Sequence, residues 1–150
     1  MNSRQVEGIL HSTIPFVKKN GIKVVKAEPG DVRLKSPNER SNQNQYGTMQ
    51  AGAIFTLAEI TGGVALLIYP QLSDYVLLAR TATITFHRPI ESDAEARAAF
   101  TDEDAFEIEH KVESEGRTVA KIKVGVFNDD SEKAAELEVE FHLSKKRKRS

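Results

Sequence analysis

A single acidic residue, Glu59, stands inside a long apolar stretch of the sequence. No other residue between Thr48 and Tyr69 carries a formal charge. A carboxylate that is buried without a partner either costs several kcal/mol or has its pKa raised. A carboxylate whose pKa moves toward neutral is well suited to general-base chemistry. Glu59 is therefore the first candidate for a catalytic group.

The apolar stretch has the length and composition of an interior helix. It is apolar on nearly every side, as expected for a helix in a protein core. Its apolar residues are Ala51, Ala53, Ile54, Phe55, Leu57, Ala58, Ile60, Val64, Ala65, Leu66 and Leu67. The start of a helix presents unpaired N–H groups and the positive end of the helix dipole.

The rest of the chain predicts an α+β domain with an antiparallel sheet. Alternation of apolar and polar residues with period two predicts strands, and apolar residues spaced by three and four predict helices. A polar stretch over 36–47 predicts a surface loop, and Ser3 is a candidate N-cap. The other expected elements are a helix over 3–19 that Pro15 kinks or splits, a hairpin of 22–27 and 31–35, strands over 76–87, 94–100, 118–127 and 135–143, and a helix over 101–115.

Length and composition are typical of one globular domain. The chain has 150 residues, 39% of them hydrophobic, and no cysteine. Disulfides, thiolate metal sites and cysteine nucleophiles are therefore excluded. No run of eighteen apolar residues predicts membrane insertion, and no secretory signal is visible, so the expected location is cytoplasmic. The histidines have no metal-ligand spacing, and no metal or cofactor is expected.

The last six residues are unlike the rest of the chain. They contain five of the positive charges, which leaves the body of the chain at −6 against a total of −1. We expect one domain over 1–144 and a basic, disordered tail over 145–150. A tail of this kind could contact nucleic acid or an anionic membrane, but it has no interleaved aromatic residues for base stacking.

Two segments together resemble a known family. Residues 44–59 read NQYGTMQAGAIFTLAE, and a TITFHRP strand follows at 83–89. They resemble the hotdog-fold acyl-CoA thioesterases of the phenylacetate-pathway type, and the helix over 101–115 resembles an uncharacterised branch of hotdog proteins described as thioesterases. The resemblance implies a hotdog fold, in which an antiparallel sheet wraps around a long central helix.

The resemblance also implies roles for particular residues. Glu59 is expected to be the catalytic base or nucleophile, and Asn44 to orient water or the thioester. The backbone at Ala51 and Gly52 is expected to bind the substrate carbonyl. Gln50 stands where the family has a histidine; it can donate a hydrogen bond but cannot titrate. The family places the acid and its site across a subunit interface, which implies a homodimer or a dimer of dimers.

Several functional readings stay open. The first is hydrolysis of an acyl-CoA or related acyl thioester, a small-molecule substrate. The second is a non-catalytic acyl-binding module, which Gln50 in place of histidine favours. A dehydratase is disfavoured because no histidine is expected beside the central helix, and nucleic-acid binding is a remote alternative. Glu59 could also be a structural carboxylate paired with Arg80 or Arg88.

Overall fold

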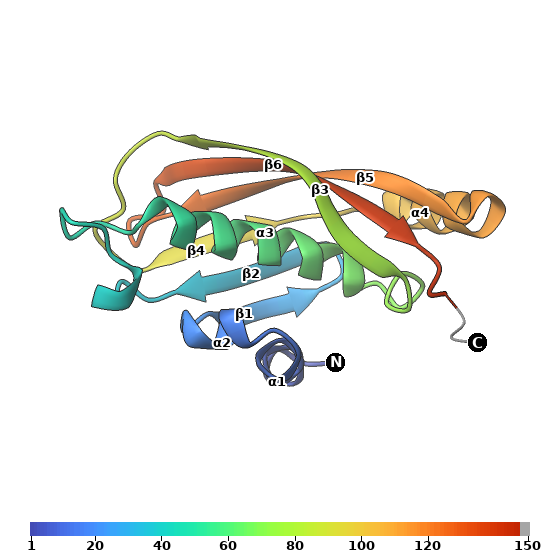
Figure 1. Ribbon diagram of the computed structural model, residues 1–150, viewed down its shortest axis with the longest axis horizontal. Helices are drawn as coiled ribbons and strands as arrows, with labels where there is room; N and C mark the ends of the chain where they lie inside the picture. Colours follow the sequence, from blue (N-terminus) through green and yellow to red (C-terminus); the bar gives the residue numbers. More distant parts are fainter. Residues whose placement is uncertain (148–150) are drawn as a thin grey trace.

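The computed structural model describes residues 1–147 and consists of a six-stranded antiparallel sheet with helices (Figure 1). The spatial order of the strands is β1-β2-β4-β5-β6-β3. Their bounds are β1 Lys23–Glu28, β2 Asp31–Ser36, β3 Val76–Phe86, β4 Ala94–Ala98, β5 Arg117–Phe127 and β6 Lys133–Ser144. Positions 148–150 of the predicted tail lie outside the described residues.

The long helix α3, Ala51–Leu67, runs along one face of this sheet (Figure 1). Its sheet-facing side is buried and includes Leu57, Ala58 and Leu66. Gly62 lies at the closest approach, because a Cβ atom there would be 3.3 Å from side chains of β5 and β6. The opposite side of α3 is only partly covered, although Phe55, Ile60 and Leu67 are apolar. Helix α3 is thus apolar on both sides, although only its sheet-facing side is buried.

Two short helices precede the sheet, where the sequence predicts one interrupted helix. α1 spans Ser3–Thr13 and α2 spans Pro15–Lys19, so Pro15 splits the helix. The N-cap of α1 is Asn2 and not Ser3: the Asn2 side chain accepts from the Gln5 N–H, and the Gln5 side chain accepts from the Asn2 N–H. This reciprocal pair is a capping box and satisfies two N–H groups at the start of the helix.

The fourth helix, α4, spans Asp102–Glu115 and lies beside β5 (Figure 1). Thr101 caps it by accepting a hydrogen bond from the Asp104 N–H at 3.0 Å, as the sequence predicts. Gly116 ends it in the left-handed conformation, with φ of 84°. No helix of residues 1–147 is both long enough and apolar enough to cross a membrane.

The loop between β2 and α3 differs from its prediction as a polar surface segment. It contains a short 3-10 helix, η1, Arg40–Asn42, and Asn42 is only 1% exposed. The Asn42 amide donates to the backbone carbonyls of Asn20 and Pro37 at 3.0 Å each. A polar side chain can be buried here because it joins two backbone segments that would otherwise be unpaired. The loop is consequently fixed against the end of α2.

Candidate active site

Glu59 lies at mid-length of α3, on the side of the helix that faces away from the sheet. Its half-buried side chain lines a cavity of about 400 Å³ between α3, α1 and the start of β3. The other lining residues are Met1, Val6, Ile9, Leu10, Ile14, Ile60, Gly63, Val64, Leu67, Ile68, Ser73 and Leu77. Glu59 is the one charged side chain in this lining, so it is the candidate there for a catalytic group.

Burial raises the pKa of the Glu59 carboxyl above its ordinary value of 4.5. The cause is desolvation, which disfavours the charged form. Among residues 1–147 no cation pairs with Glu59, and Arg88 instead pairs with Glu132. The alternative of a structural ion pair between Glu59 and Arg80 or Arg88 therefore has no support in this protomer. An unpaired, partly buried carboxylate has the properties of a general base.

Gln50 serves as the N-cap of α3. Its side-chain oxygen accepts a hydrogen bond from the Ala53 N–H at 3.0 Å. Within the described part of the chain, the N–H groups of Ala51 and Gly52 donate no hydrogen bond, and both residues are exposed. These two N–H groups are therefore free to bind an anionic oxygen. Gln50 and Gly52 also line a second cavity, of about 430 Å³, with Phe16, Asn20, Ser41, Gln43, Ala53, Phe55 and Thr56.

Asn44 lies in a tight turn just before α3. Its side-chain oxygen accepts from the backbone N–H of Tyr46 at 2.9 Å and of Thr48 at 3.2 Å, and its amide nitrogen donates to the Thr48 hydroxyl at 2.7 Å. These bonds hold the turn in place. Asn44 and Ala51 together line a third cavity, of about 520 Å³, whose other lining residues are Tyr46, Thr48, Met49, Ile54, Phe86, His87, Arg88, Pro89 and Ile90.

The predicted site residues are thus divided between separate places in one protomer. Asn44 and Ala51 share one cavity, Gln50 and Gly52 share another, and Glu59 lines a cavity of its own. Sequence reasoning missed two contributions to these cavities. One is His87, at the end of β3 near Ala51, and the other is the apolar side of α1 beside Glu59. The amphipathic pattern over 3–19 was a usable signal, but it is equally typical of a helix that packs on a core.

Comparison with known proteins identifies the family. Residues 3–145 match the model of the YiiD_C family, described as "Putative thioesterase (yiiD_Cterm)". The chain belongs to this family, and so to the thioesterase proteins of the hotdog fold. The resemblance seen in the sequence and the predicted fold class are both confirmed. No match was found among curated protein sequences.

Solved structures show the same fold over nearly the whole chain. A Pseudomonas aeruginosa protein, described as "Probable Thioesterase", has a TM-score of 0.87 and 27% identity and covers 96% of both chains. A Haemophilus influenzae thioesterase has a TM-score of 0.76 at 13% identity, covering 97% of this chain and 92% of its own. The Escherichia coli PaaI protein from the phenylacetic acid degradation operon has a TM-score of 0.71 at 16% identity, covering 93% and 91%.

Proposed function

We propose that this protein hydrolyses an acyl-CoA or a related acyl thioester, with Glu59 as the catalytic base. The observation that carries the proposal is the half-buried Glu59 carboxylate, unpaired and with a raised pKa, in a cavity whose other side chains are uncharged. The family description supports the reaction class. The substrate and the role of the carboxylate are the parts that experiment must test.

In the proposed reaction Glu59 removes a proton from a water molecule as the water oxygen attacks the thioester carbonyl carbon. The carbonyl oxygen becomes an oxyanion, which the free N–H groups of Ala51 and Gly52 stabilise. The C–S bond then breaks, and the departing sulfur takes the proton from Glu59. The products are a carboxylic acid and a free thiol, so no cofactor is required. Direct attack by the Glu59 carboxylate, followed by hydrolysis of the resulting anhydride, is the alternative order.

The base and the oxyanion donors cannot serve one carbonyl within a single protomer. Ala51 and Glu59 are eight residues apart on α3, which places them about 12 Å apart along the helix axis. They also line different cavities. We therefore infer that Glu59 of one copy acts with the start of α3 of a second copy, in a homodimer.

Strand β3 supports a dimer of this kind, because it is an uncovered edge of the sheet. Its residues Leu77, Ala82 and Phe86 are paired with buried residues of β6 and therefore lie on the core side of the sheet. Nevertheless Phe86 is 46% exposed. An exposed apolar edge strand is a ready template for pairing with another strand.

The Glu59 cavity and the cavity of Asn44 and Ala51 lie at opposite ends of β3. This arrangement fits antiparallel pairing of the β3 strands of two copies. Leu77, near one end of β3, lines the Glu59 cavity, whereas Phe86, at the other end, lines the Asn44 and Ala51 cavity. A two-fold axis near Thr81, in the middle of the strand, would set residue 77 of one copy opposite residue 85 of the other. The acid of one copy and the helix start of the other would then face the same space.

Substitution of the base tests the proposal. Glu59→Gln should lower kcat on a panel of acyl-CoA thioesters by about 100- to 10,000-fold, the usual contribution of a general base. The control is Glu103→Gln, which removes one exposed carboxylate from α4 and should keep full activity. Unchanged turnover in folded Glu59→Gln protein would show that Glu59 is not the base.

A specific observation favours a second function, a non-catalytic acyl-binding module. The Asn44 side chain uses both its oxygen and its nitrogen to hold the turn, whereas Gln50 caps α3 through its oxygen and its amide nitrogen makes no hydrogen bond within the described residues. Asn44 is therefore not free to position water without a rearrangement. Tight binding of acyl-CoA in calorimetry, with no turnover in the wild-type protein, would select this function. The cytoplasmic location remains a prediction.

A further inference from the structure

The cavity beside Glu59 is lined almost entirely by aliphatic side chains. Val6, Ile9 and Leu10 of α1 face Ile60 and Leu67 of α3 across it. Resting on the proposed function, we propose that this cavity binds the acyl group of the substrate, and that the group is an unbranched aliphatic chain of medium length. Under this assignment α1 determines the acyl specificity.

The length of the cavity sets the preferred length of the chain. Its lining runs from Glu59 of α3 to Ile68, the residue that caps the end of the helix. These nine steps along the helix correspond to about 14 Å. An extended hydrocarbon advances about 1.3 Å per carbon, as follows from C–C bonds of about 1.5 Å. A chain that begins at Glu59 therefore fills the cavity with about ten carbons.

The chemistry of the lining selects against other acyl groups. Among the described residues around this cavity, no side chain is aromatic and no side chain is basic. An aromatic acyl group would find no ring to stack on, and a dicarboxylic acyl group would bring a second carboxylate near Glu59, where no basic side chain balances it.

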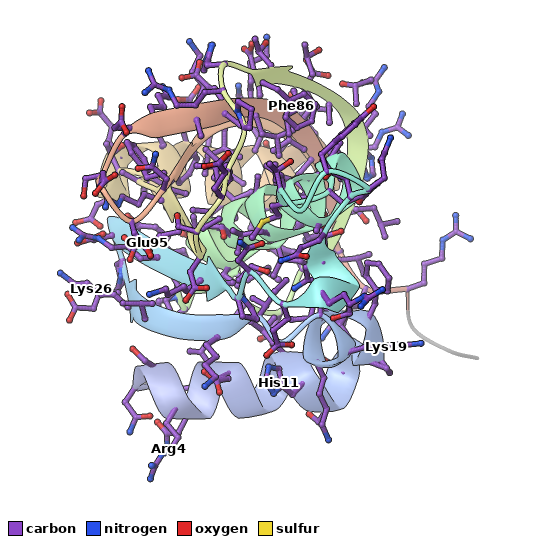
Figure 2. The ribbon with its side chains drawn as sticks, turned by 90° about the vertical axis from the view of Figure 1, so that its left-hand side faces the viewer. Arg4, His11, Lys19, Lys26, Phe86 and Glu95 are labelled. Atoms are coloured by element: carbon purple, nitrogen blue, oxygen red, sulfur yellow. The ribbon has the colours of Figure 1, made fainter. Side chains whose placement is uncertain are left out.

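The wall formed by α1 is fixed to the sheet. The Glu7 carboxylate accepts a hydrogen bond from the Val24 N–H of β1 at 2.9 Å. The His11 ring nitrogen Nε2 lies 2.7 Å from the Ile22 carbonyl oxygen, in hydrogen-bond distance, on the side of α1 that faces the sheet (Figure 2). Because α1 is held by β1, it can stay in position while a ligand occupies the space between α1 and α3.

Two adjacent glycines of α3 make the inference testable. Gly63 lines the cavity one turn after Glu59, and a Cβ atom there would be 3.4 Å from the Leu77 side chain, an ordinary contact. Gly62 instead faces the sheet at close range. A larger side chain at position 63 therefore enters the cavity without displacing the core.

The experiment compares kcat/KM for saturated acyl-CoA substrates of two to sixteen carbons. For the wild-type protein we expect kcat/KM to rise by up to about fourfold per methylene, the effect of burying one CH₂, and to stop rising near ten carbons. In Gly63→Leu, kcat/KM should stop rising with chain length beyond about four carbons, which span one helical turn. The matched control is Gly8→Leu on α1, where an added Cβ atom meets no neighbour within 4 Å and the profile should stay as in the wild type.

A second variant protects the test against a folding defect in Gly63→Leu. Ile9→Phe enlarges a side chain on the opposite wall that is 47% exposed and should shorten the preferred chain in the same way. If the wild type hydrolyses thioesters but both variants keep its length profile, the acyl assignment is wrong while the proposed function stands.

The assignment can also be tested without turnover. Should the wild type hydrolyse no thioester, the proposed function fails, and the cavity is judged by calorimetry with decanoyl-CoA and acetyl-CoA. Weaker binding of decanoyl-CoA alone in Gly63→Leu would still support an acyl site. Equal binding of the two ligands to the wild type would overturn it.

Discussion

Glu59 illustrates how one residue gains its chemistry from its surroundings. Its carboxyl is no different from the many exposed ones on α4, but the apolar residues of α1 and α3 desolvate it and raise its pKa. A carboxylate that acts as a base must be deprotonated, and raising its pKa strengthens it as a base at the cost of a smaller charged fraction in acid. The same shift affects stability, because the folded state then binds the proton more tightly than the unfolded state.

We therefore predict linked effects of pH on activity and stability. Activity should rise with pH through the raised pKa of Glu59, above 4.5. The stability contribution of protonated Glu59 is fully present below the unfolded pKa and is lost as pH rises through the folded pKa. Glu59→Gln should therefore be more stable than the wild type at neutral pH, and the difference should disappear below pH 4.5. Rate profiles and urea unfolding at several pH values check this; a difference independent of pH would contradict it.

Among the helices and strands, α1 forms one wall of the Glu59 cavity, so the shape of that cavity depends on how α1 is held in place. Glu7 accepts from the Val24 N–H of β1, next to a bulge at Val24 and Lys26, and His11 contacts the Ile22 carbonyl just before the strand. Such bonds hold the helix on the sheet independently of the apolar contacts that α1 makes elsewhere.

For this element we predict that Glu7→Ala costs about 1 kcal/mol of unfolding free energy, because the Val24 N–H loses its acceptor. Glu7→Gln keeps an acceptor oxygen and should cost less. Hydrogen exchange should show faster opening of α1 in the alanine variant than in the glutamine variant. Equal protection of α1 in both would mean that the hydrogen bond does not hold the helix.

The elements themselves could largely be predicted from the sequence. Period two in β5 and β6 marked buried and exposed faces correctly, and Lys121 of β5 pairs with Glu138 and Glu140 of β6 on the outer face. Pro15 splits the first helix, and Thr101 caps α4. Both effects involve only residues that are neighbours in the sequence, so both could be predicted. The buried state of Asn42 was not predictable, because its partners are the backbone of Asn20 and Pro37, and such pairing depends on the folded arrangement.

The candidate site could be predicted less completely than the fold. An isolated charge in an apolar helix is visible in the sequence, and this indicated Glu59. That α1 forms the other wall of its cavity was not visible, since an amphipathic pattern does not specify what its apolar side contacts. Asn44 and Glu59 line different cavities because of the direction in which α3 leaves the Asn44 turn. This direction is likewise not visible in the sequence.

At the scale of the whole molecule, the separation of Glu59 from Ala51 leads to a test by complementation. Ala51 is the first residue of α3, a position where proline is well accepted, and its N–H makes no hydrogen bond within residues 1–147. Ala51→Pro should remove one oxyanion donor and leave the helix intact. Circular dichroism of the variant checks the helix.

We predict that mixing the inactive variants Glu59→Gln and Ala51→Pro restores activity. In a mixed dimer, one site combines Glu59 of the proline variant with Ala51 of the glutamine variant, and both groups are native. A one-to-one mixture that exchanges freely should recover about a quarter of the wild-type rate, because half of the dimers have one intact site of two. No recovery, with subunit exchange verified, would place both groups in one protomer.

The uncovered edge at β3 also has a consequence for how the protein behaves on dilution. If a second copy covers that edge, stability includes a term for association, and the melting temperature should fall as the protein is diluted. A newly synthesised chain would then keep an unpaired β3 edge until it binds a second copy. In that state the edge is able to pair with strands of other proteins. Cellular abundance would thereby become one of the conditions on which correct folding depends.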